Sequence, residues 1–113
     1  MLTIYHNPRC SKSRETLKII NEAGTEVKVV EYLNEIPTKE ELVSLLKKLN
    51  LSAQDIIRKG EPVYKELYKG KELSESEWIE AMSQHPKLIE RPIVVNGDQA
   101  ILGRPPQNVI KLI

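Results

Sequence analysis

The first third of the chain alternates apolar patterns in a way that strongly limits its possible folds. Residues 2–5 form a short β-prone run, apolar side chains then recur at helical spacing from Ser11 until Gly24, and residues 27–32 are rich in β-branched side chains. A strand, a helix and a strand within about 30 residues make a βαβ unit. The two strands are therefore expected to be parallel, with a right-handed crossover between them.

Helical patterns dominate the middle of the chain. Thr38 with Glu41, and Ser52 with Asp55, are capping-box pairs that begin helices. Leucines recur on one face of the first of these helices, and two further short helical segments follow. The pattern predicts a helical insertion at about 38–85.

The tail returns to strands. Residues 93–95 and 100–102 form two short apolar runs around Asn96-Gly97-Asp98, and Asn-Gly tolerates the positive φ angles of tight hairpins. Pro105 or Pro106 then begins a last helix. The order β-α-β, helical insertion, β-β-α predicts an α/β protein of thioredoxin-like fold, with a four-stranded mixed sheet in a single domain spanning residues 1–113.

Composition limits the possible partners and the compartment. The net charge is +1, which argues against broad nucleic-acid or membrane binding, and no run approaches a membrane span. The one cysteine excludes an internal disulfide and a cysteine-rich zinc site, so no metal is expected. It also fits a reducing compartment, and the N-terminus has no signal-peptide pattern. We expect a soluble, cytoplasmic protein.

That one cysteine, Cys10, is the leading candidate for chemistry. It follows the first predicted strand, where open α/β sheets place their sites, and it precedes a helix whose N–H groups favour an anion. Arg9, Lys12 and Arg14 surround it in sequence. An ordinary thiol is only a few per cent ionised at pH 7, and all these features favour the thiolate. A small buried cysteine is the alternative interpretation.

The residues near Cys10 narrow the chemistry. Ser13 stands where a dithiol redox site would have its second cysteine, so a mixed disulfide at Cys10 needs an external thiol to resolve it. The tract is not a phosphatase loop of the Cys-x5-Arg type, because position 16 is Thr and Arg14 comes too early. His6 is either a strand-end histidine bonded to the backbone or a partner that helps to hold Cys10 as thiolate.

Four tracts resemble a known family in order along the chain: "YHNPRCSKSRETL", "IIRKGEPVYKEL", "HPKLIERPIVV" and "LGRPP". The chain is similar to the bacterial, single-cysteine, glutaredoxin-coupled arsenate reductases (ArsC-like), which have a thioredoxin-like architecture. The residues beside Cys10 are bulkier and more basic than in the best-known members, and the chain stops soon after its last helix. It therefore looks nearest to a short-chain branch of the family.

The resemblance implies a role for each matching residue. Cys10 matches the nucleophile, His6 matches a histidine linked to thiolate formation, and three arginines match the oxyanion site: Arg58, Arg91 and Arg104. The Arg91–Pro92 bond is expected to be cis. The implied reaction is reduction of arsenate, or a similar oxyanion, to arsenite. Glutathione is the implied co-substrate, glutaredoxin the implied partner, and no tightly bound cofactor is needed.

Two other functions share features with this sequence. A regulator of the Spx type has the same fold and binds RNA polymerase, but many such proteins carry a Cys-x-x-Cys switch that Ser13 removes here. A monothiol glutaredoxin-like protein also uses Cys-x-x-Ser and sometimes binds an iron–sulfur cluster. The three arginines have no obvious use there.

Overall fold

The structure is a computed structural model that describes residues 1–113, and it divides into two compact units. The first unit combines Met1–Glu35 with Arg91–Ile113, and the second is Ile36–Glu90. The helical insertion expected at about 38–85 falls within the second unit. That the two units fold as one domain stays a prediction.

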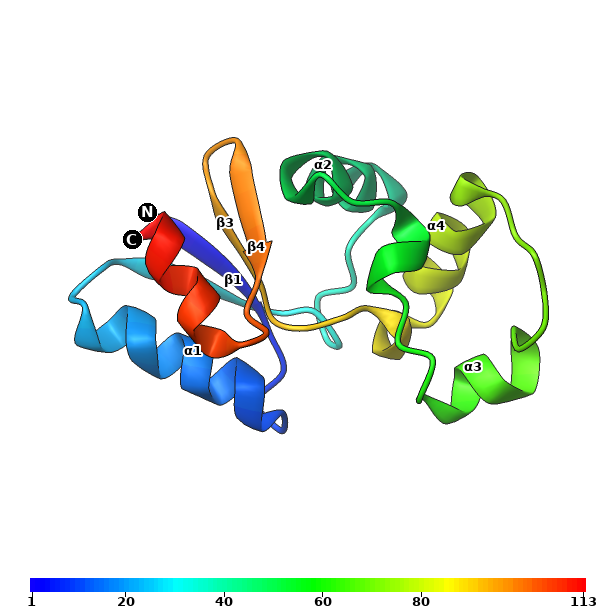
Figure 1. The fold of residues 1–113 in the computed structure, drawn as a ribbon, viewed down its shortest axis with the longest axis horizontal. Helices are drawn as coiled ribbons and strands as arrows, with labels where there is room; N and C mark the ends of the chain where they lie inside the picture. The colour runs from blue at the N-terminus through cyan, green and yellow to red at the C-terminus, as the bar shows by residue number, and fades with distance from the viewer. The chain divides into compact units, whose positions relative to one another are not determined.

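The first unit contains a four-stranded mixed sheet with the strand order β2-β1-β3-β4 (Figure 1). Its strands are β1 (Leu2–His6), β2 (Val27–Glu31), β3 (Ile93–Asn96) and β4 (Gln99–Leu102). β1 pairs parallel with β2, and β3 pairs antiparallel with both β1 and β4. The predicted α/β class and mixed sheet are confirmed.

Helix α1 (Ser11–Glu22) and the C-terminal 3-10 helix η3 (Pro106–Leu112) lie side by side against this sheet (Figure 1). The core between them is aliphatic, as the absence of Phe requires. Its fully or largely buried members are Leu2, Ile4, Ile20, Val94, Val109 and Leu112. Burying each such side chain contributes about 1.5–3 kcal/mol, so this cluster holds the sheet and both helices together.

The buried face of α1 differs in part from its apolar pattern. Ser13 and Thr16 are fully buried beside Ile20, whereas Ala23 is exposed and lies past the last turn as the C-cap. Gly24 follows with φ +72°, which ends the helix as expected. The helix therefore packs through small polar side chains near the cysteine and through aliphatic ones farther along.

The hairpin at 96–99 also differs slightly from the prediction. Gly97 has φ +61°, but Asn96 stays in the strand, where it pairs with Gln99. The turn residues are therefore Gly97 and Asp98. Asn96 instead uses its side-chain Nδ2 to donate to the carbonyl of Leu112, at 2.8 Å.

The second unit is helical. Its elements are α2 (Lys39–Leu49), η1 (Ala53–Ile56), α3 (Pro62–Leu67), α4 (Glu75–Gln84) and η2 (Pro86–Leu88). The two predicted capping boxes are present, and a third lies at Ser74. Pro62 begins α3, where proline suits the first helical position.

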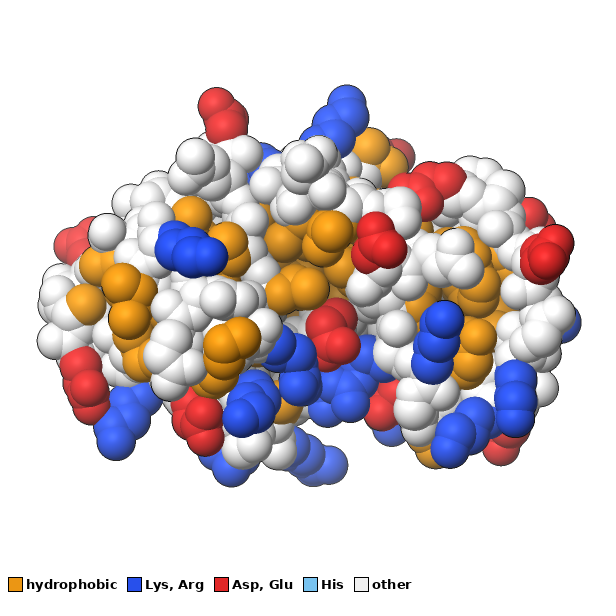
Figure 2. Space-filling view, viewed as in Figure 1, with side chains coloured by type: hydrophobic (Ala, Val, Ile, Leu, Met, Phe, Trp, Pro, Cys, Tyr) orange, Lys and Arg blue, Asp and Glu red, His pale blue; other side chains and the backbone are white.

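No helix in the structure combines the length and the apolar character that crossing a membrane requires. Figure 2 shows basic and acidic side chains across the face in view, with apolar groups between them. This mixture agrees with the net charge of +1.

Candidate active site

Cys10, Arg91 and Arg104 come from segments that the sheet brings to one end. Cys10 follows β1, Arg91 precedes β3, and Arg104 follows β4. β1 and β4 both run antiparallel to β3. The end of β1, the start of β3 and the end of β4 therefore lie at the same end of the sheet. The order of the strands therefore places the thiol beside two arginines that are distant in sequence.

Cys10 is the N-cap of α1, in extended conformation. A tight turn precedes it: the Cys10 N–H donates to the carbonyl of Asn7, and the Arg9 N–H donates to the Asn7 side-chain Oδ1, each at 3.0 Å. Asn7 therefore holds this turn through both its backbone carbonyl and its side chain, as asparagine commonly does. The Cys10 side chain is 8% exposed, so its sulfur is largely shielded from water yet not sealed inside the protein.

Opposing effects act on the Cys10 thiol. Burial alone raises its pKa, but hydrogen bonds from the Ser13 and Lys12 backbone N–H groups, and the hydrogen bond and charge of Arg91, together hold the pKa below its ordinary value. The first N–H groups of a helix have no acceptor within the helix. A thiolate sulfur at the N-cap can accept hydrogen bonds from them. These contacts stabilise the thiolate, which is the nucleophilic form of cysteine, relative to the thiol.

Arg104, which follows β4, also approaches the Cys10 sulfur. Its Nη2 lies 3.7 Å from Cys10 Sγ, and its Nε donates to the carbonyl of Arg91 at 2.8 Å. Each arginine precedes a cis proline, since the Arg91–Pro92 and Arg104–Pro105 bonds are both cis. The first was expected from the resemblance and is confirmed, whereas the second was not predicted.

His6 contacts Ser13. Its ring Nδ1 lies 2.6 Å from the Ser13 hydroxyl, which also accepts the Asn7 backbone N–H at 3.0 Å. Burial is the main reason that the pKa of His6 lies below its ordinary value, with Glu31 opposing the shift and Arg14 adding to it. His6 is therefore neutral near pH 7. Its link to the thiolate runs through Ser13, whose own N–H bonds the sulfur.

Arg58 belongs to the second unit, where two carboxylates surround it. Its Nε lies 3.8 Å from Glu61 and its Nη1 lies 3.4 Å from Glu90. Its backbone N–H donates to the carbonyl of Leu88 at 2.8 Å. A part for Arg58 in oxyanion binding stays a prediction.

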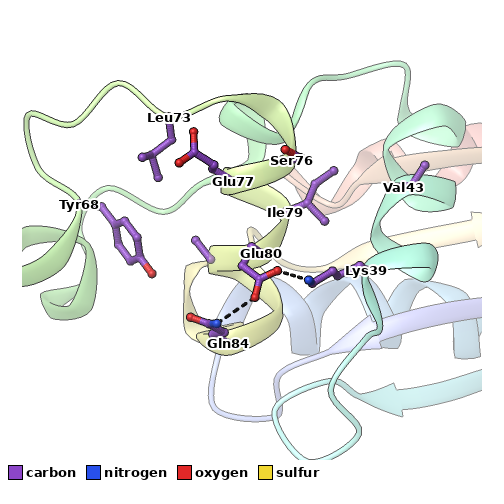
Figure 3. A pocket seen from close by; sticks show the side chains of 10 residues that line it. Lys39, Val43, Tyr68, Leu73, Ser76, Glu77, Ile79, Glu80 and Gln84 are labelled. Atoms are coloured by element: carbon purple, nitrogen blue, oxygen red, sulfur yellow. Dashed lines mark hydrogen bonds and ion pairs between the residues drawn. The ribbon is translucent and has the colours of Figure 1, made fainter.

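A groove in the second unit has a volume of about 600 Å³, and neither Cys10 nor an arginine lines it (Figure 3). Its wall combines apolar side chains such as Tyr68 with an ion pair between Lys39 and Glu80. Glu80 also accepts a hydrogen bond from Gln84 at 2.9 Å. Glu77, also drawn there, accepts the Ser74 backbone N–H at 3.0 Å, and no group of side chains in the chain has the make-up of a metal site.

Some supporting residues were not predicted. Gly103 packs so closely that a Cβ there would lie 2.5 Å from Thr16 Oγ1 and 2.6 Å from Pro92 Cγ. Asn108 holds the backbone on both sides of Gly103. A glycine directly before Arg104 was the one available signal for this close approach, whereas nothing marks Asn108 in the sequence.

The fold and the site together define a thioredoxin-like protein with one activated cysteine facing two arginines. The model of the ArsC family matches residues 5–112, so the chain belongs to the ArsC family. This confirms the resemblance found in the sequence.

Known relatives agree with this assignment. The chain is 49% identical to the uncharacterised protein YfgD of Escherichia coli K12, over 97% of this chain and 94% of the relative. It is 43% identical to an arsenate reductase of Haemophilus influenzae, over 97% of both. The solved structure of an arsenate reductase from Vibrio cholerae superposes with a TM-score of 0.95 at 46% identity, covering 99% of this chain and 97% of that one.

Proposed function

We propose that this protein is an oxidoreductase that reduces arsenate to arsenite, with Cys10 as its nucleophile. The observation that carries the proposal is the position of Cys10 Sγ, at the start of α1 and 3.7 Å from the Arg104 guanidinium. Membership of the ArsC family and the named arsenate reductases among its relatives support arsenate as the oxyanion.

The first step is attack of the Cys10 thiolate on arsenic. An S–As bond forms, an As–O bond breaks, and the oxygen leaves as water after protonation. Arsenate resembles phosphate and carries between one and two negative charges near neutral pH. The guanidinium groups of Arg91 and Arg104 suit it, because they stay charged and offer paired donors to such oxygens. They also offset the charge that develops in the transition state.

The second step is reduction by an external thiol. Glutathione attacks Cys10 sulfur in the thiol–arsenate adduct, the S–As bond breaks, and its electron pair stays on arsenic, which leaves as arsenite. The product on the protein is a Cys10–glutathione disulfide. Glutaredoxin, with glutathione as the source of electrons, then returns Cys10 to the thiolate. The need for an outside thiol follows from the single cysteine in the chain.

Other residues have supporting parts in the proposal. His6 keeps the cysteine turn in place through Ser13, and Arg58 is a third oxyanion ligand that the resemblance implies. The reaction uses no metal and no tightly bound cofactor, and glutathione enters as a co-substrate. The proposed compartment is the cytoplasm, where low-molecular-weight thiols keep cysteines reduced.

The decisive experiment is a coupled assay of arsenate reduction with glutathione, glutaredoxin, glutathione reductase and NADPH. Wild-type protein should consume NADPH in proportion to arsenate, and Cys10→Ser should abolish turnover while leaving the circular dichroism spectrum unchanged. Omission of glutaredoxin should stop multiple turnovers, and so should omission of glutathione. Equal activity of the Cys10→Ser variant and the wild type would reject the mechanism.

A further inference from the structure

The backbone that carries Arg104 is fixed at several points. The Gly103 N–H donates to the Pro92 carbonyl at 2.9 Å, which ties the end of β4 to the start of β3. The Arg104 Nε donates to the Arg91 carbonyl at 2.8 Å. Arg104 itself is exposed, so the direction of its guanidinium depends on how firmly this segment is held.

Asn108 supplies a further restraint. It lies in the first turn of η3 and is half-buried, and its backbone N–H donates to the Pro105 carbonyl at 3.0 Å. Its side-chain Nδ2 donates to two carbonyls, those of Leu102 and Arg104, at 3.2 Å each. One amide therefore clamps the chain on both sides of Gly103.

We propose that Asn108 is a positioning residue, which holds Arg104 in the orientation that serves both the Cys10 thiolate and the bound oxyanion. The part of this inference that concerns the bound oxyanion rests on the proposed function. The part that concerns the Cys10 thiolate does not. Asn108 touches neither group, and it acts through the carbonyl of Arg104. A displacement of about 1 Å in a positioned group can cost on the order of a hundredfold in rate, so one clamp on this segment has a measurable effect.

The chain provides a matched control. Asn96 also donates a side-chain amide hydrogen bond to a backbone carbonyl, since its Nδ2 lies 2.8 Å from the carbonyl of Leu112, the last residue of η3. Asn96→Ala removes one side-chain hydrogen bond to a backbone carbonyl and Asn108→Ala removes two, each worth about 0.5–1.5 kcal/mol. Only Asn108 is bonded to the residue that approaches Cys10. Asn108→Ala should therefore cost more stability than Asn96→Ala by about one such hydrogen bond, and it alone should change the site.

The experiment compares Asn108→Ala, Asn108→Leu and Asn96→Ala in the full chain. Leu nearly preserves the size of Asn108 and removes its donors. Iodoacetamide alkylation of Cys10 against pH reports the pKa of the thiol, and the arsenate assay reports kcat/KM. Melting temperatures show that each variant is folded.

Both Asn108 variants should raise the thiol pKa and lower kcat/KM for arsenate by about tenfold or more. Asn96→Ala should leave the thiol pKa unchanged and kcat/KM within about twofold. Equal changes at the two asparagines, or an unchanged thiol pKa in the Asn108 variants, would overturn the proposal. If wild-type protein fails to reduce arsenate, the proposed function fails, and the alkylation profiles still decide the part of Asn108.

Discussion

The Nδ1 atom of His6 lies 2.6 Å from the hydroxyl oxygen of Ser13, and both side chains are buried. That hydroxyl also accepts the Asn7 backbone N–H at 3.0 Å, so it has two buried polar partners. The same residue donates its backbone N–H to Cys10. Ser13 thus joins the histidine, the turn before the cysteine and the thiolate in one network.

Removing the hydroxyl should cost both stability and reactivity. Ser13→Ala leaves the Asn7 N–H and the His6 Nδ1 buried without their partner, which should lower the free energy of unfolding by about 1–3 kcal/mol. The loosened turn should also slow alkylation of Cys10 near pH 7. Urea unfolding and iodoacetamide kinetics measure the two effects.

Ser11→Ala is the matched control for that change, since Ser11 is in the same first turn but is exposed and its side chain makes no hydrogen bond within the protein. Its unfolding free energy should stay within about 0.5 kcal/mol of the wild type. Equal losses in the two variants would show that the buried hydroxyl contributes nothing specific.

The stability of the fold should depend on the protonation of His6. Burial is the main cause of its pKa lying below the ordinary value of 6.5. Below that ordinary value the unfolded chain takes up a proton that the folded protein still rejects. The contribution of His6 to stability is therefore complete above about pH 6.5 and is lost as the pH falls toward the folded pKa.

The test is urea unfolding of wild type and His6→Gln between about pH 5 and about pH 8. Glutamine does not titrate, so the variant should lose less stability than the wild type on acidification. Parallel pH profiles for the two proteins would mean that His6 has the same pKa in the folded and unfolded states.

Arg91 should lower the pKa of the Cys10 thiol through direct contact, and not merely through the net charge of the protein. It bonds the sulfur and adds a positive charge next to it. Arg91→Gln should therefore raise the thiol pKa and move the alkylation profile to higher pH, so that the variant reacts more slowly than the wild type on the acid side. Arg9→Gln removes an equal charge from the exposed neighbour of Cys10 and should leave the profile in place. Equal displacement of the profile in both variants would point to net charge instead of a specific contact.

The fold was predictable because its signals are local or follow from general rules. The alternation of apolar patterns identified each strand, and the βαβ rule made β1 and β2 parallel. The glycines at the end of α1 and in the hairpin marked breaks that need positive φ. Asn96 was assigned to the turn because Asn-Gly is a general turn signal, whereas its bond to Leu112 is a tertiary contact that no local pattern contains.

The site was predictable only in part. Cys10 was identified by its place between a strand and a helix, and the resemblance selected Arg58, Arg91 and Arg104 from the five arginines of the chain. The bond between His6 and Ser13 was not predicted, because a serine in a first helical turn ordinarily faces water. Burial of that serine depends on the sheet beneath α1, and the sequence shows the helix without showing which face meets the sheet.

The close packing at Gly103 leads to the last prediction. A Cβ at this position would lie 2.5 Å from Thr16 Oγ1 and 2.6 Å from Pro92 Cγ, so α1 or the start of β3 must move to accommodate it. Gly103→Ala should lower the free energy of unfolding by about 1–3 kcal/mol, the usual cost of overpacking. Gly60→Ala is the control, since a Cβ at Gly60 meets nothing within 4 Å and its φ is not positive. Because Arg104 follows Gly103 directly, Gly103→Ala should also slow alkylation of Cys10, and Gly60→Ala should not. Equal free energies of urea unfolding for the two variants would mean that the packing around Gly103 accommodates a Cβ without loss of stability.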